Sequence, residues 1–237
     1  MTLSEDLKSK VRQVMESQWS VKQANTVPYA SSLTLTGIVA KLDATVVYAD
    51  MRSSSKLVDE LSQRAAGKIY QAFLYSLARI ITSNGGEITA YDGDRVMGIF
   101  IGDSKETMAT KSALMINYAV SNILRPMLEG HFKSLGWPGF QISHCVGIDT
   151  GSFLAVKAGL RDANDIVWIG RPPNLAAKLS EVRQINQSTY ISNEVFMALD
   201  SWIKISSVNK VPLWERKIFE YIDEKLTIYS TDAFIKF

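Results

Sequence analysis

An apolar run at residues 44–49 that ends on an acidic residue constrains the fold of this chain more than any other segment. The run, ATVVYA, is typical of a central strand buried on both faces, and it stops at Asp50. Residues 57–82 follow with apolar side chains at helical spacing: Leu61, Ala65, Ile69, Phe73, Leu77 and Ile80. A buried strand joined to a long amphipathic helix predicts a domain in which helices cover a sheet.

The rest of the chain continues this mixture of strands and helices. We expect the first long helix to end at Asn84-Gly85-Gly86, and a hairpin over residues 87–91 and 96–101 to follow. Later elements are expected as a helix over 105–135 that Pro126 interrupts, strands over 140–148 and 166–169, a helix over 174–182, and two or three strands with a short helix beyond Tyr190. This order predicts an α+β sandwich of the ferredoxin-like type, with helices packed on a mostly antiparallel sheet.

Residues 1–40 are predicted to form an N-terminal helix and a surface linker, and residues 41–237 a single folded domain. The helix, with Ser4 as its expected N-cap, is indicated by apolar side chains at helical spacing: Leu3, Leu7, Val11, Val14 and Met15. A polar stretch around Pro28 is typical of a linker. A chain of 237 residues is long enough for one sizeable domain.

Composition argues against several classes of function. The net charge of +2 gives no reason to expect nucleic acid as a partner. Cys145 is the only cysteine, so no disulfide can form within the chain, and with His131 and His144 it makes no zinc-binding pattern. The N-terminus lacks the apolar core of a secretory signal, and no stretch reaches the roughly 18 apolar residues of a membrane span. We therefore expect a cytoplasmic protein without membrane insertion.

Two aspartates stand where a predicted strand meets a turn. Asp50 directly follows the buried strand, and Asp94 lies in the turn of the hairpin. If the strand and the hairpin are neighbours, both carboxylates point toward one place, where they suit a hard divalent cation such as Mg²⁺ or Mn²⁺. The alternative is that Asp50 caps the next helix and Asp94 only forms the turn, and spacing alone favours this second interpretation.

Two further segments have the residue types that hold phosphates and sugars. Small polar residues follow Asp50 and precede a helix, where main-chain N–H groups bind phosphate well, although such a run is also ordinary helix capping. Asn174 and Lys178 are four residues apart and share one helix face, where they have the chemistry to hold a ribose oxygen and a phosphate oxygen. A lysine on a helix surface is more commonly just solvated.

Four segments, taken in order, resemble the catalytic domain of the class III nucleotide cyclases: VVYADMRSSS, ITAYDGDRVMGIF, VGIDTG and IGRPPNLAAKLS. The resemblance implies that residues 41–237 are this domain. It further implies two divalent ions, Mn²⁺ or Mg²⁺, held by Asp50, Asp94 and the main-chain carbonyl of Met51. The segment similar to the family's phosphate loop contains Arg52, Ser53, Ser54 and Ser55.

The resemblance also assigns roles on the predicted 174–182 helix. Asn174 matches the residue that orients the ribose, and Lys178 stands where the family usually has a transition-state arginine. Lysine offers a point charge without the planar fork of arginine, so Arg171 or Arg183 are alternative phosphate ligands. In this family the aspartate pair and the Asn/basic pair come from opposite subunits. Because one chain here has both sets, the resemblance implies a homodimer with two equivalent sites.

The positions that read the base carry neither purine code of the family. Adenylate cyclases have Lys and Asp, and guanylate cyclases Glu and a small polar residue, where this chain has Ala90 and Val167. The large neighbours Tyr91 and Trp168 make a smaller pocket if one of them points inward, which favours a pyrimidine. If both aromatic rings point into the core instead, the expectation is a promiscuous enzyme.

A compact cyclase that lacks both purine codes is most similar to the bacterial Pycsar cyclases. This resemblance implies a uridylate cyclase that makes cyclic UMP from UTP as a second messenger in antiphage defence, read by a downstream effector protein. The alternatives are a cytidylate cyclase, an adenylate cyclase with an atypical base pocket, and a catalytically degenerate domain that only binds nucleotide. A polymerase-type nucleotidyltransferase shares the two-carboxylate logic, but the sequence shows no basic groove for a template.

Overall fold

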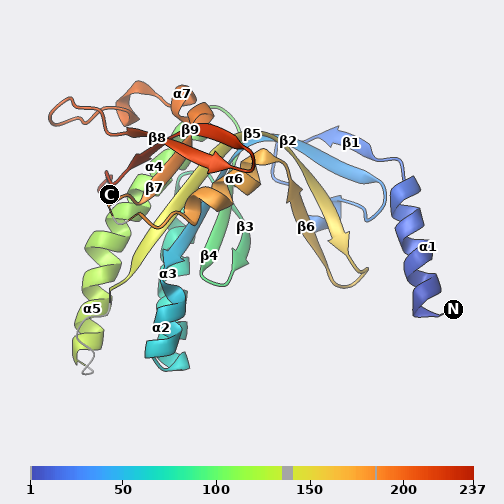
Figure 1. Cartoon of the computed structure of the whole chain (residues 1–237), viewed down its shortest axis with the longest axis horizontal. Coiled ribbons are helices and arrows are strands. Elements are labelled where there is room, and N and C mark those ends of the chain that lie inside the picture. Colours follow the sequence, from blue (N-terminus) through green and yellow to red (C-terminus); the bar gives the residue numbers. More distant parts are fainter. Residues whose placement is uncertain (1, 135–140, 185) are drawn as a thin grey trace.

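The structure is a computed structural model that describes residues 2–134, 141–184 and 186–237. Its described strands form one sheet in the order β3-β4-β2-β5-β7-β9-β8, with β1 added on β2 and β6 on β5 (Figure 1). The strands are β1 (Ser20–Gln23), β2 (Ile38–Arg52), β3 (Glu87–Asp92), β4 (Arg95–Phe100), β5 (Ser143–Gly159), β6 (Asn164–Ile169), β7 (Thr189–Ser192), β8 (Glu215–Tyr221) and β9 (Glu224–Thr231).

Seven α-helices accompany the sheet in the described residues, and two of the sheet's neighbour pairings are parallel. The helices are α1 (Leu3–Glu16), α2 (Ser54–Glu60), α3 (Gln63–Ser83), α4 (Lys105–Ala119), α5 (Arg125–Ser134), α6 (Arg171–Ser180) and α7 (Asn193–Ala198). β1 runs parallel to β2 and β7 parallel to β5, whereas the other pairs are antiparallel. The predicted α+β fold with helices on a mostly antiparallel sheet is confirmed.

The central strand β2 is buried on both faces, as the uninterrupted apolar run predicts. Val47 and Ala49 pack with α3 and α4 on one face, whereas Val46 lies in a second cluster on the other. β2 extends to Ile38, well before the predicted start, and pairs with β5 from Ala40 to Arg52. This long ladder places the end of β2, where Asp50 lies, inside the sheet.

Helix α6 covers the face of the sheet opposite α3 and α4, and one glycine permits its close approach. Leu175 and Leu179 are buried with Tyr190 of β7. A Cβ atom added at Gly147 of β5 would lie 2.5 Å from Ser180 N and 2.7 Å from the Leu179 Cβ, besides striking the Ala176 carbonyl. A side chain at this position would therefore push α6 off the sheet.

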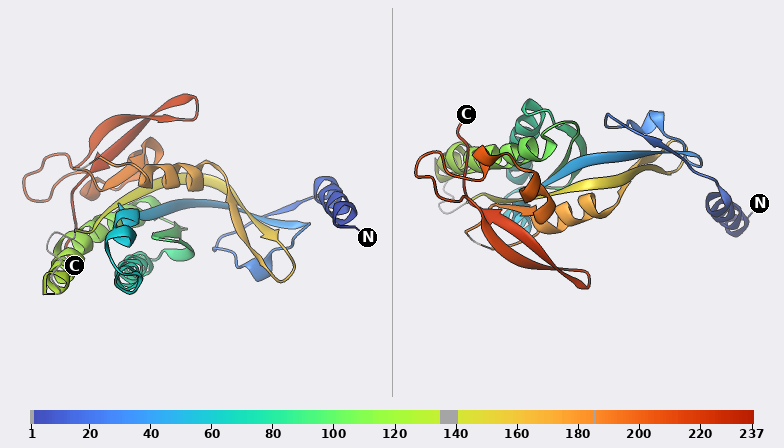
Figure 2. Two further views of the ribbon diagram at one scale, coloured as in Figure 1. Left: turned by 60° about the horizontal axis from the view of Figure 1, so that its bottom comes forward. Right: turned by 90° about the horizontal axis from the view of Figure 1, so that it is seen from above.

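Part of the sheet extends away from the helical body. The N-terminal half of β2 and the C-terminal half of β5 leave the body together with β1 and β6, and α1 lies at the far end (Figures 1 and 2). We call residues 20–44 and 151–169 the arm. Val27 and Leu33, in the stretch predicted as a linker, are buried against β2 and β5 of the arm. The domain boundary at residue 41 stays a prediction.

Several predicted element ends differ from the structure. The helix predicted over residues 57–82 is two helices, because Leu61 is extended and the Ser62 side chain accepts a bond from Ala65 N that starts α3. Thr2 caps α1 in place of Ser4, through a reciprocal pair of bonds with Glu5. Helix α6 begins three residues before Asn174, because prolines fit the first helical turn.

The predicted interruption of the helix over 105–135 is present but precedes Pro126. A π-helical turn at Val120–Leu124 separates α4 from α5, and Pro126, which has no main-chain N–H donor, follows directly as the second residue of α5. Leu135 and Phe140, which end the predicted helix and begin the predicted strand, lie outside the described residues. None of the helices in the described ranges has the length and apolar character needed to cross a membrane.

Replacement of Gly147 by alanine tests the contact between β5 and α6. We expect Gly147→Ala to destabilise the protein by about 1–3 kcal/mol, because the new methyl group meets main-chain atoms that cannot rotate away. Urea unfolding followed by circular dichroism measures this change. Gly67→Ala is the matched control: nothing lies within 4 Å of its added Cβ on α3, so stability should stay level or rise by about 1 kcal/mol. Equal urea midpoints for Gly147→Ala and Gly67→Ala would contradict a close contact between β5 and α6.

Candidate active site

The structure brings the two predicted metal-binding aspartates to one edge of the molecule. β2 pairs with β4, and Asp50 lies opposite Arg95 in this ladder. Asp94 immediately precedes Arg95 in the hairpin turn, so the two carboxylates belong to neighbouring strand ends. Their proximity is visible electrostatically, since the charge of Asp94 contributes to raising the pKa of Asp50. The predicted adjacency of strand and hairpin is confirmed.

Asp50 is a buried carboxylate at the end of its strand. Only 4% of the residue is exposed, and this burial raises its pKa to about 6. The Arg183 guanidinium opposes the shift, donating from Nη2 to Asp50 Oδ2 at 2.9 Å. The carboxylate is therefore enclosed by the protein, and its Oδ2 atom is paired with the Arg183 cation.

The donor set of this edge suits a divalent ion that also takes ligands from a substrate. Within the described ranges, no group of three or more His, Cys, Asp or Glu side chains is arranged to hold a metal ion. Two carboxylates and a main-chain carbonyl are too few ligands to enclose Mg²⁺ or Mn²⁺, which commonly complete their shells with water and phosphate oxygens. Asp50, Asp94 and Met51 fit such an open site.

The predicted phosphate loop leads from β2 into α2. Ser53, the N-cap of α2, has a φ of 59°, a left-handed conformation that few side chains adopt without strain. Arg52 does not extend freely from this loop: its Nη2 donates to the carbonyls of Val182, at 3.3 Å, and Gln187. A pocket of about 220 Å³ borders Arg52, Ser53 and Lys56. Lys56, which borders this pocket, was not among the predicted phosphate ligands.

Helix α6 presents its predicted catalytic side chains outward. Asn174 and Lys178 are exposed, whereas Leu175 and Leu179 on the opposite face are buried. Lys178 Nζ lies 3.0 Å from Glu181 Oε2, and Glu181 Oε1 lies 3.2 Å from Arg95 Nη1. This chain of ion pairs joins the C-terminal end of α6 to the hairpin that holds Asp94.

Four residues that the sequence interpretation did not assign to the metal site surround it. Arg95 lies opposite Asp50, Tyr48 precedes Asp50 by two residues on the same strand face, and Glu181 and Arg183 follow α6. Burial raises the pKa of Tyr48, and the charge of Arg95 opposes that shift. The two-residue period of a β-strand could have indicated Tyr48, because it places Tyr48 on the same face as Asp50. No sequence pattern indicated the ion pairs of Glu181 and Arg183.

The structure separates the predicted base-pocket residues into two pairs. Ala90 and Trp168 both pack against the cluster that contains Val46, and the Trp168 ring meets Phe153 edge-on with 6.0 Å between centroids. Tyr91 and Val167 occupy the alternate strand positions and are 57% and 46% exposed. The pocket assignment of all four stays a prediction.

A pocket of about 170 Å³ lies beside Trp168. Its walls include residues 87–89 of β3, Asp165 of β6 and residues 27–30, which come from the stretch expected to be a linker. The N-terminal segment is therefore part of the surroundings of the predicted base pocket, which the sequence did not indicate.

Arg171, one of the alternative phosphate ligands, is engaged elsewhere in this structure. Its guanidinium binds Glu194 of α7 through two parallel contacts of 2.7 and 2.9 Å, and its Nε lies 3.6 Å from Asp149 Oδ2. Burial raises the pKa of Asp149 to about 6, against the opposing effects of Ser192 and Arg171. This network ties the start of α6 to β5 and α7.

Comparison with solved structures identifies the fold. It matches the crystal structure of the adenylyl cyclase CyaB from P. aeruginosa with a TM-score of 0.67 and 21% identity, over 81% of this chain and 95% of that chain. The chain thus has the fold of the class III nucleotide cyclases. No family model matches the sequence.

Similarity to characterised sequences defines the family within this class. The chain is 36% identical over 236 residues to the uridylate cyclase of Rhodovulum sp. (strain MB263), covering 100% of this chain and 98% of the relative. It is 38% identical over 233 residues to the uridylate cyclase of Xanthomonas perforans, covering 98% and 97%. The chain belongs to the uridylate cyclase family and is a nucleotide cyclase.

Asp149 gives stability a defined pH dependence. Its folded pKa of about 6 lies above the ordinary value of 3.8, so the folded state holds the proton more tightly than the unfolded state. The resulting stabilisation is complete below about pH 4 and is lost as the pH rises through 6. Asp149→Asn stays neutral, so its stability relative to the parent should rise by roughly 2–3 kcal/mol between pH 4 and pH 8. Urea unfolding of both proteins across this pH range measures the difference in unfolding free energy. A difference that does not change with pH would contradict the raised pKa of Asp149.

Proposed function

We propose that this protein cyclises UTP to 3′,5′-cyclic UMP and diphosphate. The observation that carries the proposal is the buried Asp50 beside Asp94, at the end of the central strand of a chain that matches uridylate cyclases over its whole length. In this reaction the ribose 3′-oxygen forms a bond to the α-phosphorus as the bond to diphosphate breaks, and the 3′-hydroxyl proton is released.

Asp50, Asp94 and the Met51 carbonyl would hold two Mn²⁺ or Mg²⁺ ions. When bound, such ions lower the pKa of the 3′-hydroxyl and neutralise charge on the phosphates. The protein's own part is to keep Asp50 ionised and fixed at the strand end. Ser53, Ser54 and Ser55 would cradle the phosphates at the start of α2, with Lys56 beside them.

Asn174 and Lys178 would act on a nucleotide held mainly by a second copy of the chain. Both side chains face outward from α6, away from the core of their own protomer. In this proposal Asn174 orients the ribose, and Lys178 exchanges its pairing with Glu181 for the charge that develops on the phosphates. In this proposal each site takes the aspartate pair from one copy and the Asn/Lys pair from the other. Because one chain has both sets, two copies form a homodimer with two equivalent sites.

Ala90 and Trp168 would form the wall that meets the base. Ala90 provides no polar group for a purine edge, and Trp168 is held by Phe153 where a large ring would need space. Beside a wall that contains this large side chain, the smaller ring of uracil needs less space than a purine, which favours uracil. The similarity to the Pycsar cyclases supports a role for the product as an antiphage signal, read by a separate effector protein.

Competition among the four ribonucleoside triphosphates tests the substrate. With Mn²⁺ and equal concentrations of ATP, GTP, CTP and UTP, we expect cyclic UMP to exceed each other product by at least about tenfold, the ratio that a difference of 1.4 kcal/mol in binding produces. Mass spectrometry of the products measures the ratio. Faster turnover of ATP or GTP would contradict the proposal, and nucleotide binding without any cyclic product would indicate a degenerate domain.

Mixing two inactive variants tests the shared active site. Asp50→Asn and Asn174→Ala should each abolish cyclisation, because each removes one half of both sites. An equal mixture in which subunits exchange should recover about a quarter of the parent activity, since half of the dimers then contain one intact site. Cyclic UMP formation before and after mixing measures the recovery. Absence of recovery, with heterodimers demonstrated by native mass spectrometry, would place both halves in one protomer.

A further inference from the structure

Arg183 makes a contact that the proposed reaction does not use. It follows α6 by three residues, and its Nη2 lies 2.9 Å from Asp50 Oδ2. Its Nη1 donates to the Ser180 carbonyl at the end of the helix, at 3.1 Å. The guanidinium is thus oriented toward the predicted metal ligand by the end of the helix that holds Lys178.

The contact matters because Asp50 has few alternatives. The Asp50 side chain is 6% exposed, so water gives its charge little support. Arg95 lies opposite Asp50 in the sheet, but its guanidinium binds Asp92 and Glu181. Among the described residues, Arg183 is the side chain that forms a direct ion pair with Asp50.

We infer that Arg183 occupies the cation position of the metal site in the free enzyme, holding the Asp50 carboxylate in place until a divalent ion displaces it. This inference rests on the proposed function, since it takes Asp50 to be a metal ligand. A guanidinium and a metal ion compete for the same carboxylate and repel each other at close range. Arg183 is therefore a positioning residue that opposes metal binding.

The surroundings of Arg183 allow its side chain to leave without a change of fold. Half of the side chain, 50%, is exposed, so the guanidinium can turn toward water. The next residue has partners of its own: the side-chain oxygen Gln184 Oε1 accepts a bond of 2.7 Å from Lys217 and one of 3.3 Å from Tyr190. Displacement thus requires rotation of one side chain, not movement of the segment.

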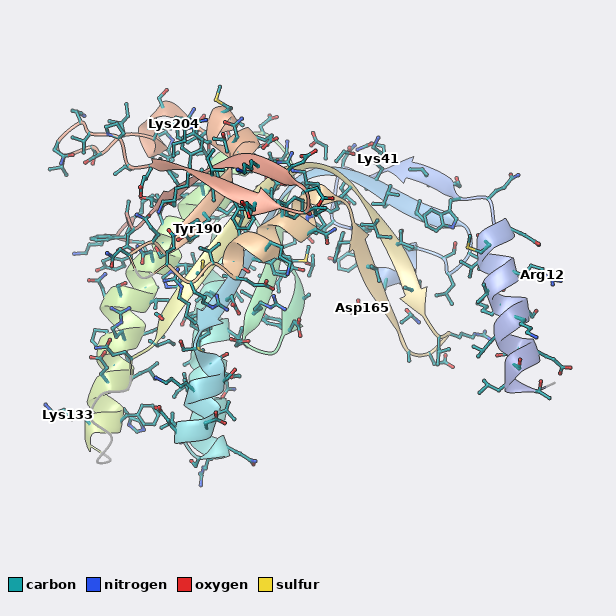
Figure 3. The ribbon with its side chains drawn as sticks, viewed as in Figure 1. Arg12, Lys41, Lys133, Asp165, Tyr190 and Lys204 are labelled. Atoms are coloured by element: carbon teal, nitrogen blue, oxygen red, sulfur yellow. The ribbon has the colours of Figure 1, made fainter. Side chains whose placement is uncertain are left out.

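Binding of Mn²⁺ alone tests the competition. In electron paramagnetic resonance titrations without nucleotide, we expect Arg183→Met to bind Mn²⁺ roughly tenfold more tightly than the parent, because the competing charge is gone. Arg183→Lys retains a cation and should lie between the two. Arg12→Met is the control, since Arg12 lies on α1 at the far end of the molecule (Figure 3). Equal or weaker Mn²⁺ binding by Arg183→Met would overturn the inference.

Thermal unfolding of the metal-free protein provides a second readout. Arg183→Met should lower the transition temperature by about 2–4 °C, because Asp50 loses its counter-charge. In the Asp50→Asn background the same replacement should have almost no effect, and this non-additivity identifies the pair. Equal losses in both backgrounds would mean that Arg183 stabilises the fold without acting through Asp50.

The outcomes separate this inference from the proposed function. If UTP is cyclised but Arg183→Met binds Mn²⁺ like the parent, the competition is wrong and the cyclase assignment stands. If Arg183→Met binds Mn²⁺ more tightly while no triphosphate is cyclised, the competition stands and the cyclase assignment fails.

Discussion

The antiparallel pairing of β2 with β5 is the constraint on which the rest of the site depends. This ladder holds Asp50 opposite Cys145, two residues before Gly147, the position at which α6 touches the sheet. The distance between the carboxylate end of β2 and the outward face of α6 is therefore set by strand register. A slip of β2 by one residue would turn Asp50 to the face covered by α3, and a slip of β5 by one residue would replace Gly147 with a side chain under α6.

The charges at this site largely neutralise one another in the free protomer, but the ion pairs differ in strength. Lys178 and Glu181 have side chains 60% and 42% exposed, so their bond is worth little and a substrate phosphate can replace Glu181 readily. Asp50 is buried, and its pairing with Arg183 matters more because an unpaired buried charge is costly. The weak pair therefore belongs to a lysine that can exchange Glu181 for a phosphate, whereas the Asp50–Arg183 pair gives way only when another cation takes the place of the guanidinium.

The sequence predicted the parts of the site that depend on local periodicity. The buried run before Asp50 and the turn at Asp94 fixed two strand ends, and neighbouring strands then placed both carboxylates together. The contacts of Arg52 and Arg183 were not accessible, because each joins the end of β2 to the segment after α6, whose path depends on tertiary packing. The helix break at Ser62 was missed because a side-chain cap outweighed the apolar spacing.

The base-pocket residues show where sequence and structure must be combined. Strand alternation alone implies that Val167 and Trp168 face opposite sides of β6, but it does not say which side each residue faces. Only the sheet register, which pairs Trp168 with Ala155, shows that the tryptophan faces the cluster next to Ala90. An adenylyl cyclase has this same fold at 21% identity, so the backbone does not select the base. In the proposed enzyme, selection therefore depends on a few side chains, and the large one among them is Trp168, which packs edge-on against Phe153 and faces the same cluster as Ala90.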